Sequence, residues 1–388
     1  MKGSDSVTER IAIVGAGLAG VTAAETIRKK DSSVPITVFG DEDMPFYTRI
    51  RLPELVAGKL ERKKLMIKKL DWYENKGIDL HLRSRVEKIE SEKKQLILDS
   101  GESFTYGRLL LANGASCFIP PFEGSQLDGV IAVRTVEDAA LLRERCLRGG
   151  NVVVVGGGLL GLEMAAAIAG FVDQVTVVEI APWLLVRQLD EEGGNLLQER
   201  LEDMGLQFRT GVSVKAIKGK ESVDTVELDD GGRLKASVVV VSAGIKANTS
   251  LAESAKCSTK KGVLVDSYLS TDVEDIYAAG DCIEHDGKLY GIWSAAEEQG
   301  KIAGENLCGG EVLYQGTVPS NRLKVSGIDV FSVGQFDPKK QMDSRIERGN
   351  GTYRKLVYND EGKLVGAILI GDLSDQRSIA RQIEGEQK

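Results

Sequence analysis

Two glycine-rich motifs have the spacing that binds a dinucleotide. Each follows an apolar run and opens a helix-like stretch, and they read Gly15-Ala-Gly17-Leu-Ala-Gly20 and Gly156-Gly-Gly158-Leu-Leu-Gly161. In this pattern the first glycine permits a tight turn, the second lets the backbone approach a pyrophosphate, and the third lets the helix pack on the strand. The helix N-terminus adds free N–H groups and a partial positive charge. The sequence therefore predicts two dinucleotide sites on one chain.

Acidic residues beyond each motif indicate which dinucleotides these are. Asp41, with Glu42 beside it, and Glu179 lie roughly 20 residues after the third glycine, where a carboxylate binds a ribose 2′-hydroxyl. The same carboxylate would repel a 2′-phosphate, and no arginine follows Glu179 before Arg187. We therefore expect the second site to favour NADH over NADPH. In the alternative, the turns only pack helix on strand and the acids are solvated; the duplication argues against it.

The elements that position these residues are duplicated along the chain. Both copies follow the order strand, glycine turn, helix and second strand, which falls at 11–14, 15–20, to about 30 and 36–39, and again at 152–155, 156–161, to about 171 and 175–178. Alternation of helices with apolar strands predicts parallel sheets that are buried on both faces. We predict an α/β fold of two Rossmann-like, three-layer ββα domains and a small α+β C-terminal domain. The expected limits are 1–114 with 246–314, then 115–245, then 315–388.

The third segment, from about residue 317, has no motif of its own. Its pattern predicts short strands and a closing helix, with strands at 325–334, 353–357 and 364–370.

Composition excludes several other classes of protein. The chain has 388 residues, 42% apolar and 28% charged, and a net charge of −8, which argues against nucleic-acid partners. Its five cysteines form no CxxC pair, so we expect a reducing cytoplasm and no metal site. The start, 1–10, is polar and does not read as a signal peptide. The apolar stretch 152–171 contains Glu163 and several glycines, so a buried strand, turn and helix explains it better than a membrane span.

These motifs resemble a known family over nearly the whole chain. The matching segments are 15–20, 111–115 (Leu-Ala-Asn-Gly-Ala), 154–163 and 276–281 (Ile-Tyr-Ala-Ala-Gly-Asp). The family is that of the FAD-dependent pyridine nucleotide-disulfide oxidoreductases, with two dinucleotide domains. The segment 179–193 and the C-terminal domain resemble the NADH:rubredoxin reductases and the flavin part of the NAD(P)H nitrite reductase large subunit.

The resemblance implies that the first domain binds FAD and the second NADH. It places Asp41 at the adenosine ribose of FAD with Glu42 beside it, Val86 on the adenine side, Glu179 at the ribose of NADH, and Glu163 near the nicotinamide. The implied catalytic residues are Glu163 and Arg49, and Arg49 is also an implied cofactor contact. Val86 and Trp293 have the alternative reading of simple core residues. The remaining implied contacts are Gly15, Gly17, Ala19, Gly20, Ala112, Gly114, Arg134, Asp281 and Trp293 for FAD, and Gly156, Gly158, Leu160, Gly161 and Gly244 for NADH.

The sequence also departs from its relatives. Many carry a redox-active cysteine near the flavin, whereas Cys117 and Cys282 flank motifs without a partner in sequence and are expected to be inert. Some relatives have a lysine after the second strand, and here Arg49 or Arg51 takes that place. The nitrite reductases continue into iron–sulfur and sirohaem domains, which this sequence lacks, so we expect that it does not reduce nitrite itself.

We therefore predict a cytoplasmic reductase that passes electrons from NADH through FAD to a small carrier protein such as rubredoxin or ferredoxin. No membrane partner is expected, and a homo-oligomer stays open. The alternatives are an NADH oxidase that uses oxygen, the flavin subunit of a multi-protein reductase, and a nucleotide-sensing protein. A basic stretch, Lys59–Lys69, would either steer an acidic carrier or form a solvated helix face.

Overall fold

The computed structural model describes residues 10–318, 320–325, 327–336 and 341–386. The polar start that we examined for a signal peptide therefore lies outside the described residues, apart from Arg10. The chain forms two compact units, which are described separately: Met1–Thr48, Lys63–Ser116 and Ile245–Thr317 make the first, and Arg49–Arg62, Cys117–Gly244 and Val318–Lys388 make the second. These units are packing groups and not cofactor domains, so the expected domain limits stay a prediction.

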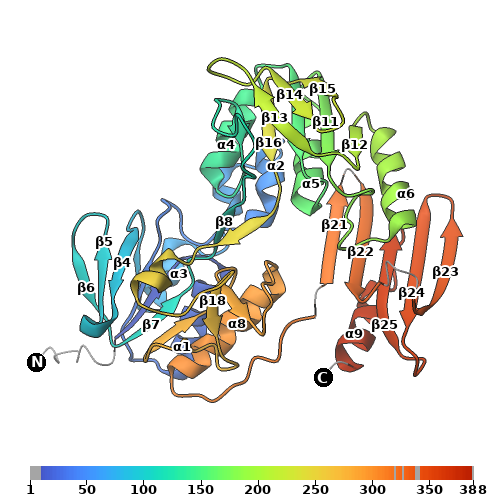
Figure 1. Cartoon of the computed structure of the whole chain (residues 1–388). Coiled ribbons are helices and arrows are strands. Elements are labelled where there is room, and N and C mark those ends of the chain that lie inside the picture. Colours follow the sequence, from blue (N-terminus) through green and yellow to red (C-terminus); the bar gives the residue numbers. More distant parts are fainter. Residues whose placement is uncertain (1–9, 319, 326, 337–340, 387–388) are drawn as a thin grey trace, which may run out of the picture. The chain divides into compact units, whose positions relative to one another are not determined.

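A parallel five-stranded sheet forms the centre of the first unit, in the order β19-β7-β1-β2-β3 (Figure 1). Its inner strands are short apolar runs that are buried along their whole length, as expected for a sheet covered on both faces. Helices α1 and α8 pack side by side. The elements are β1 Ile11–Val14, α1 Leu18–Lys30, β2 Ile36–Phe39, α3 Leu70–Asn75, β3 Ile78–His81, β7 Arg108–Leu111, β19 Ile276–Ala278 and α8 Trp293–Leu307.

An antiparallel meander, β4-β5-β6, completes the three layers of this unit. Its buried residues Ile89 and Leu96 belong to the same core as the parallel sheet, and Phe104 meets Phe39 edge to face at 5.0 Å. The other elements are β4 Val86–Glu90, β5 Gln95–Leu98, β6 Ser103–Thr105, β8 Ala115–Cys117 paired with β17 Ile245–Ala247, α7 Ser250–Ser254, and β18 Val263–Val265 paired with β20 Ile283–His285.

The second unit repeats this plan. Its parallel sheet has the order β12-β11-β10-β16-β9. The antiparallel meander β13-β14-β15 falls between β12 and β16 along the chain. The stretch 152–171 is a strand, turn and helix as predicted, although the helix ends at Ile168. Among the described residues, no helix is both long and apolar enough to cross a bilayer. The elements are α2 Leu52–Val56, β9 Val130–Ile131, α4 Val136–Cys146, β10 Asn151–Val155, α5 Leu159–Ile168, β11 Gln174–Glu179, α6 Glu191–Glu202, β12 Gln207–Thr210, β13 Val214–Lys218, β14 Thr225–Leu228, β15 Arg233–Lys235 and β16 Val238–Val241.

The C-terminal part is a five-stranded antiparallel sheet, β21-β22-β25-β24-β23, with helix α9 packed on β22 and β25. The predicted strand 325–334 is corrected to β22, which starts at Ile328 and pairs with a separate strand, β21. Strand β23 was not predicted, because its residues DSRIERG are polar and almost all exposed, as befits a sheet edge. The elements are β21 Ser320–Val325, β22 Ile328–Gly334, β23 Asp343–Gly349, β24 Thr352–Tyr358, β25 Leu364–Ile370 and α9 Gln376–Glu386.

Candidate functional site

The two glycine-rich turns have the same backbone geometry. Gly15 and Gly156 have φ values of +116° and +112°, a region that side chains disfavour. A Cβ atom on Gly15 would lie 2.1 Å from the carbonyl oxygen of Ala112, and one on Gly156 would lie 2.3 Å from that of Ser242. Each turn therefore passes directly over the end of the neighbouring central strand, and only glycine fits there.

The third and second glycines complete two matched cradles. A Cβ on Gly20 or Gly161 would lie 2.0 or 2.1 Å from the carbonyl oxygen of the first glycine in its own turn. In contrast, a Cβ on Gly17 or Gly158 would meet nothing within 4 Å, and neither residue offers a side-chain cap to the helix that follows. The N–H groups of the first helical turn have no partner within the helix. Both cradles thus fit a pyrophosphate.

The second cradle holds a carboxylate next to its turn. Glu179 ends strand β11, and its Oε2 accepts the N–H of Gly157 at 2.6 Å while its Oε1 accepts the N–H of Ala181 at 2.7 Å. These two bonds fix the carboxylate beside the glycine turn, where a ribose would lie if a dinucleotide occupied the cradle.

The first cradle differs at the matching position. The N–H of Gly15 donates to the carbonyl oxygen of Phe39, and the N–H of Gly156 donates to that of Val178, so Phe39 and Val178 occupy equivalent positions. The residues that follow them, Gly40 and Glu179, therefore correspond to each other. Asp41 follows Gly40 and is exposed. The neighbouring Glu42 accepts the hydroxyl of Tyr47 at 2.5 Å, which directs its carboxylate toward that ring.

Two other segments meet the first turn. Ala112 and Gly114 follow β7, and their backbone is held by a reciprocal pair in which Asn113 Nδ2 donates to the Asn248 carbonyl at 3.0 Å and Asn248 Nδ2 donates to the Asn113 carbonyl at 2.9 Å. The Oδ1 atom of Asn113 is buried and has no hydrogen-bond partner. Such an atom suits a site that a ligand completes.

The segment that carries Asp281 reaches the same turn from the end of the unit. Gly280 lies against Ala19, with a built Cβ 3.0 Å from the Ala19 Cβ atom, and it donates its N–H to the buried Gln299 at 2.9 Å. Gln299 in turn donates to the hydroxyl of Tyr314 at 3.0 Å. The half-buried Asp281 is therefore carried on a backbone that a buried polar pair holds against the first cradle. Sequence analysis missed Gln299 and Tyr314, because neither belongs to a motif.

Glu163 lies on α5, two residues after Gly161. Burial raises the pKa of its carboxyl to about 7, and the negative charge of Glu54 adds to the rise. Glu54 is itself bound by Arg51 through two bonds of 2.7 Å. The raised pKa favours the protonated carboxyl of Glu163, which can donate a hydrogen bond.

The structure brings Arg49 and Arg134 together. Arg49 Nη1 donates to the carbonyl oxygen of Arg134 at 2.5 Å, and Arg134 precedes the capping box formed by Thr135 and Asp138 at the start of α4. Both arginines belong to the second unit, with Glu163. The resemblance implied a cofactor contact for both arginines, and these contacts stay predictions.

Other predicted positions are placed more simply. Val86 is 5% exposed in the core of the first unit, and Trp293 begins α8 with its ring 6.0 Å from Phe46, so each also has a packing role. Leu160 is partly exposed in the first turn of α5. Gly244 has φ +108° and accepts the N–H of Phe118 at 2.9 Å.

All five cysteines are free thiols. Burial raises the pKa of each, to about 11 for Cys146 and about 12 for Cys282, so the reactive thiolate is disfavoured. Arg134 and Arg49 lower the pKa of Cys117 without cancelling the effect of burial.

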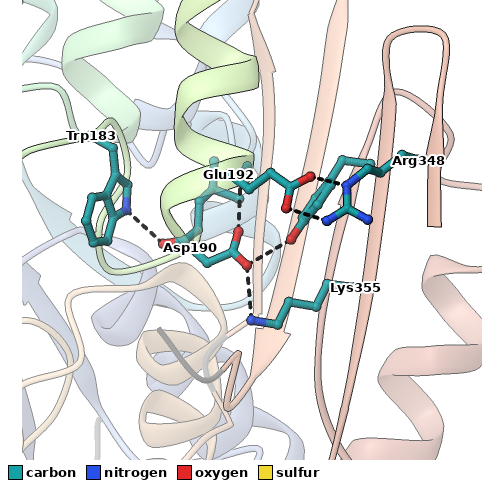
Figure 2. A network of polar contacts seen from close by, with 8 residues as sticks. Trp183, Asp190, Glu192, Arg348 and Lys355 are labelled. Carbon is teal, nitrogen blue, oxygen red and sulfur yellow. Dashed lines mark hydrogen bonds and ion pairs between the residues drawn. The ribbon is translucent and has the colours of Figure 1, made fainter. Parts of the chain in front are cut away.

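A polar cluster that sequence analysis missed lies between α6 and the C-terminal sheet (Figure 2). Asp190 caps α6 and also binds Tyr353 and Lys355 of β24, while Glu192 binds Arg348 of β23. A cavity of about 470 Å³ lies beside it, lined by α6 residues and by the β23–β24 hairpin. None of the predicted cofactor residues lines that cavity.

Two Rossmann-type halves, each with a cradle that fits a pyrophosphate, define a protein of the class with two dinucleotide-binding folds. The chain belongs to the family described as pyridine nucleotide-disulphide oxidoreductase, whose sequence model matches residues 9–300. A second family, the rubredoxin NAD+ reductase C-terminal domain, matches residues 319–387.

Individual relatives agree with this membership. The nitrite reductase [NAD(P)H] of Bacillus subtilis is 36% identical over 383 residues, which are 97% of this chain and 47% of that protein. The NADH-rubredoxin oxidoreductase of Clostridium acetobutylicum is 30% identical over 97% of this chain and 94% of its own, and its crystal structure has a TM-score of 0.81. The reductase in a covalent putidaredoxin reductase–putidaredoxin complex is 25% identical, with a TM-score of 0.86 over 98% of this chain and 94% of that chain.

These comparisons confirm the predicted family and fold class. The family and its NADH-rubredoxin oxidoreductase relative imply FAD and NADH, which confirms the predicted cofactors. The chain spans about half the length of the first of these relatives.

Proposed function

We propose that this chain is a flavoprotein reductase that takes electrons from NADH and passes them through FAD to a small electron-carrier protein such as rubredoxin. FAD binds at the cradle 15–20 and NADH at the cradle 156–161. The observation that carries the proposal is one turn built twice, with a backbone-bound carboxylate, Glu179, beside the second copy. The five cysteines of the chain are free thiols, which supports our proposal that the protein works in a reducing compartment, the cytoplasm.

The cofactors supply the electron chemistry: nicotinamide gives a hydride, and flavin passes electrons on singly or together. The protein supplies binding and orientation. The N–H groups at the start of α1 and α5 bind the pyrophosphates, and Glu179 binds the ribose of NADH. Glu163, with a pKa near 7, holds a proton close to the nicotinamide. No side-chain nucleophile is required.

The test is a side-by-side assay of acceptors. Purified protein with bound FAD is mixed with NADH and, separately, rubredoxin, ferredoxin or oxygen. We expect NADH to bleach the flavin without oxygen and rubredoxin to restore its colour over many turnovers. Fast oxygen consumption without a carrier would make the protein an NADH oxidase instead. A colourless protein that cannot be reconstituted with FAD would overturn the proposal.

The basic stretch Lys59–Lys69 is the candidate surface for the carrier. It is not the helix face considered above, because its described backbone contains a 3-10 turn, Arg62–Leu65, followed by a bend. Lys63 and Lys64 are exposed there, and the apolar Ile67, three residues further along the chain, is 46% exposed. Exposed positive charges in the same stretch as an exposed apolar residue suit an acidic redox protein.

Charge reversal tests this surface. We expect Lys63→Glu/Lys64→Glu to lower kcat/KM for rubredoxin about tenfold or more at low ionic strength, with a smaller effect at high salt. Lys215→Glu/Lys235→Glu makes the same charge change at exposed positions of the β13–β15 meander and is the control. Equal losses in both double variants, or no loss at any ionic strength, would exclude the stretch as the docking surface.

A second candidate function is the flavin part of a longer or multi-protein reductase. The observation in its favour is the nitrite reductase relative, of which this chain matches about half. NADH that bleaches the flavin while rubredoxin, ferredoxin and oxygen all fail as acceptors is the outcome that favours this candidate.

A further inference from the structure

A buried ion pair links the C-terminal sheet to the start of α6. Asp190 and Lys355 are 3% and 1% exposed, and Lys355 Nζ lies 3.0 Å from Asp190 Oδ2. The same oxygen accepts the hydroxyl of Tyr353 at 2.8 Å, while Oδ1 accepts the N–H of Gly193 at 3.1 Å. Figure 2 shows this carboxylate at the start of α6, facing strand β24. A buried charge needs such partners, so the position of Asp190 depends on the sheet.

The loop 180–189 connects Glu179, the last residue of β11, to Asp190, the N-cap of α6. Trp183 donates its indole N–H to the carbonyl oxygen of Leu189 at 3.2 Å, beside Asp190 (Figure 2). Leu185 donates its N–H to the carbonyl oxygen of Gly157 at 3.2 Å and has a φ of +53°, which a leucine adopts only when its neighbours hold it there. The loop is thus fixed to the glycine turn at one point and to Asp190 at its end.

Two consecutive glycines of α6 let the sheet and the loop approach neighbouring faces of the helix. A Cβ on Gly193 would lie 3.4 Å from Ile370 Cδ1 of β25, and one on Gly194 would lie 2.5 Å from Trp183 Cδ1. Leu184 then carries the packing onward, because its Cδ2 lies 2.9 Å from where a Cβ on Gly157 would be. Ile370 and Trp183 therefore lie close against the glycine backbone of α6, and Leu184 lies close against Gly157, whose N–H binds Glu179.

We propose that Lys355, with Tyr353, is a positioning residue for NADH, which acts through Asp190 and the loop 180–189 on Glu179 and Gly157. The C-terminal domain would then set the affinity of the second cradle for the dinucleotide. This inference rests on the proposed function, because it requires NADH at that cradle.

The test compares Lys355→Met with Arg348→Met in the FAD-loaded enzyme. We expect Lys355→Met to raise KM for NADH and Kd for NAD+ about 2- to 30-fold, the range typical of coupling through packed networks. We expect kcat with a non-protein acceptor such as ferricyanide, and the flavin content, to stay within about twofold of the wild type. The control, Arg348 of the neighbouring strand β23, binds Glu192 of α6 and is exposed. It should leave both constants unchanged.

Two further variants protect the test against a simple folding defect. Asp190→Asn/Lys355→Met removes both charges and retains a capping side chain, so it should bind NADH more tightly than Lys355→Met alone. Trp183→Phe removes the indole donor within the loop and should raise KM in the same direction.

Unchanged NADH affinity in both Lys355→Met and Trp183→Phe overturns the inference, and so does an equal loss in Arg348→Met. If Glu179→Gln leaves NADH binding unchanged in the otherwise native enzyme, the proposed function of the cradle fails instead.

Discussion

The two glycine-rich turns have one backbone but present different charges. Gly15 and Gly156 adopt nearly the same φ, and each lies against the carbonyl of the neighbouring central strand. At the position where the second turn has Glu179, bonded to Gly157, the first has Gly40, on which a Cβ would lie 3.1 Å from the Ala16 Cβ atom.

The helices that follow differ as well. Two residues after its third glycine, α5 carries the half-buried Glu163 and α1 carries Thr22. On the proposed assignment, the two turns would bind the pyrophosphate that both dinucleotides share, and the acidic side chains beside the second turn would distinguish NADH from FAD.

Alanine in place of the first glycine of each turn should have the largest effect, and each substitution should abolish binding at its own turn only. We expect Gly15→Ala to lose FAD and to lower the unfolding free energy by about 2 kcal/mol or more, because the new Cβ would meet the Ala112 carbonyl at an unfavourable φ. Gly156→Ala should retain FAD but lose NADH binding. Visible absorbance per polypeptide and NAD+ titration measure the two losses.

The control for that pair is the second glycine of each turn, where a Cβ meets nothing. Gly17→Ala and Gly158→Ala should change the stability of the cofactor-free protein little and still weaken binding. FAD retained at full stoichiometry by Gly15→Ala would contradict the assignment of the first cradle.

Removal of the carboxylate of Glu179 should have the second largest effect and should distinguish the second turn from the first. Glu179→Gln should weaken NADH binding about 10- to 100-fold, since it removes the charged acceptor of a ribose hydroxyl, and should narrow the preference over NADPH. The matched change Asp41→Asn should affect FAD retention much less, because Asp41 is exposed. KM values for both nucleotides and FAD dissociation measure this. A stronger effect at Asp41 would reverse the comparison.

The pH dependence of the unfolding free energy should reveal Glu163, the buried acid that α5 carries and α1 lacks. Burial raises the pKa of Glu163 from 4.5 to about 7, so the folded protein holds a proton that the unfolded chain releases between those values. Stability therefore falls as pH rises from about 4.5 to 7, by about 3 kcal/mol, and stays lower above pH 7. Glu163→Gln should remove this part of the slope and be the more stable protein at pH 8. Urea unfolding midpoints of both proteins at pH 5 and pH 8 measure this. The same change between the two pH values in the wild type and in Glu163→Gln would show that the carboxyl is not buried.

The smallest effects should come from Cys117 and Cys282, the two cysteines that flank sequence motifs. Cys117→Ser and Cys282→Ala should leave NADH-driven flavin reduction within about twofold of the wild type, because burial raises the pKa of both thiols. Stopped-flow absorbance measures the rate. Loss of turnover in either variant, with FAD still bound, would give that thiol a redox role.

Much of the architecture was predictable because its signals are local. Apolar runs such as 152–155 predicted parallel strands, and the glycine spacing located both turns, so the fold class and the family were inferred correctly. The polar edge strand β23 carried no such signal. The roles of single site residues stay predictions, although the structure places Glu179 directly against its turn.

The amino-acid sequence by itself determined the two cradles, since a glycine at a tight turn and an apolar strand before it act over a few residues. Only the tertiary structure decided that Gly40 corresponds to Glu179, that β19 from the distant end of the unit completes the first sheet, and that Lys355 neutralises Asp190. Those outcomes depend on burial and on contacts between residues far apart in the chain, which spacing along the sequence does not encode.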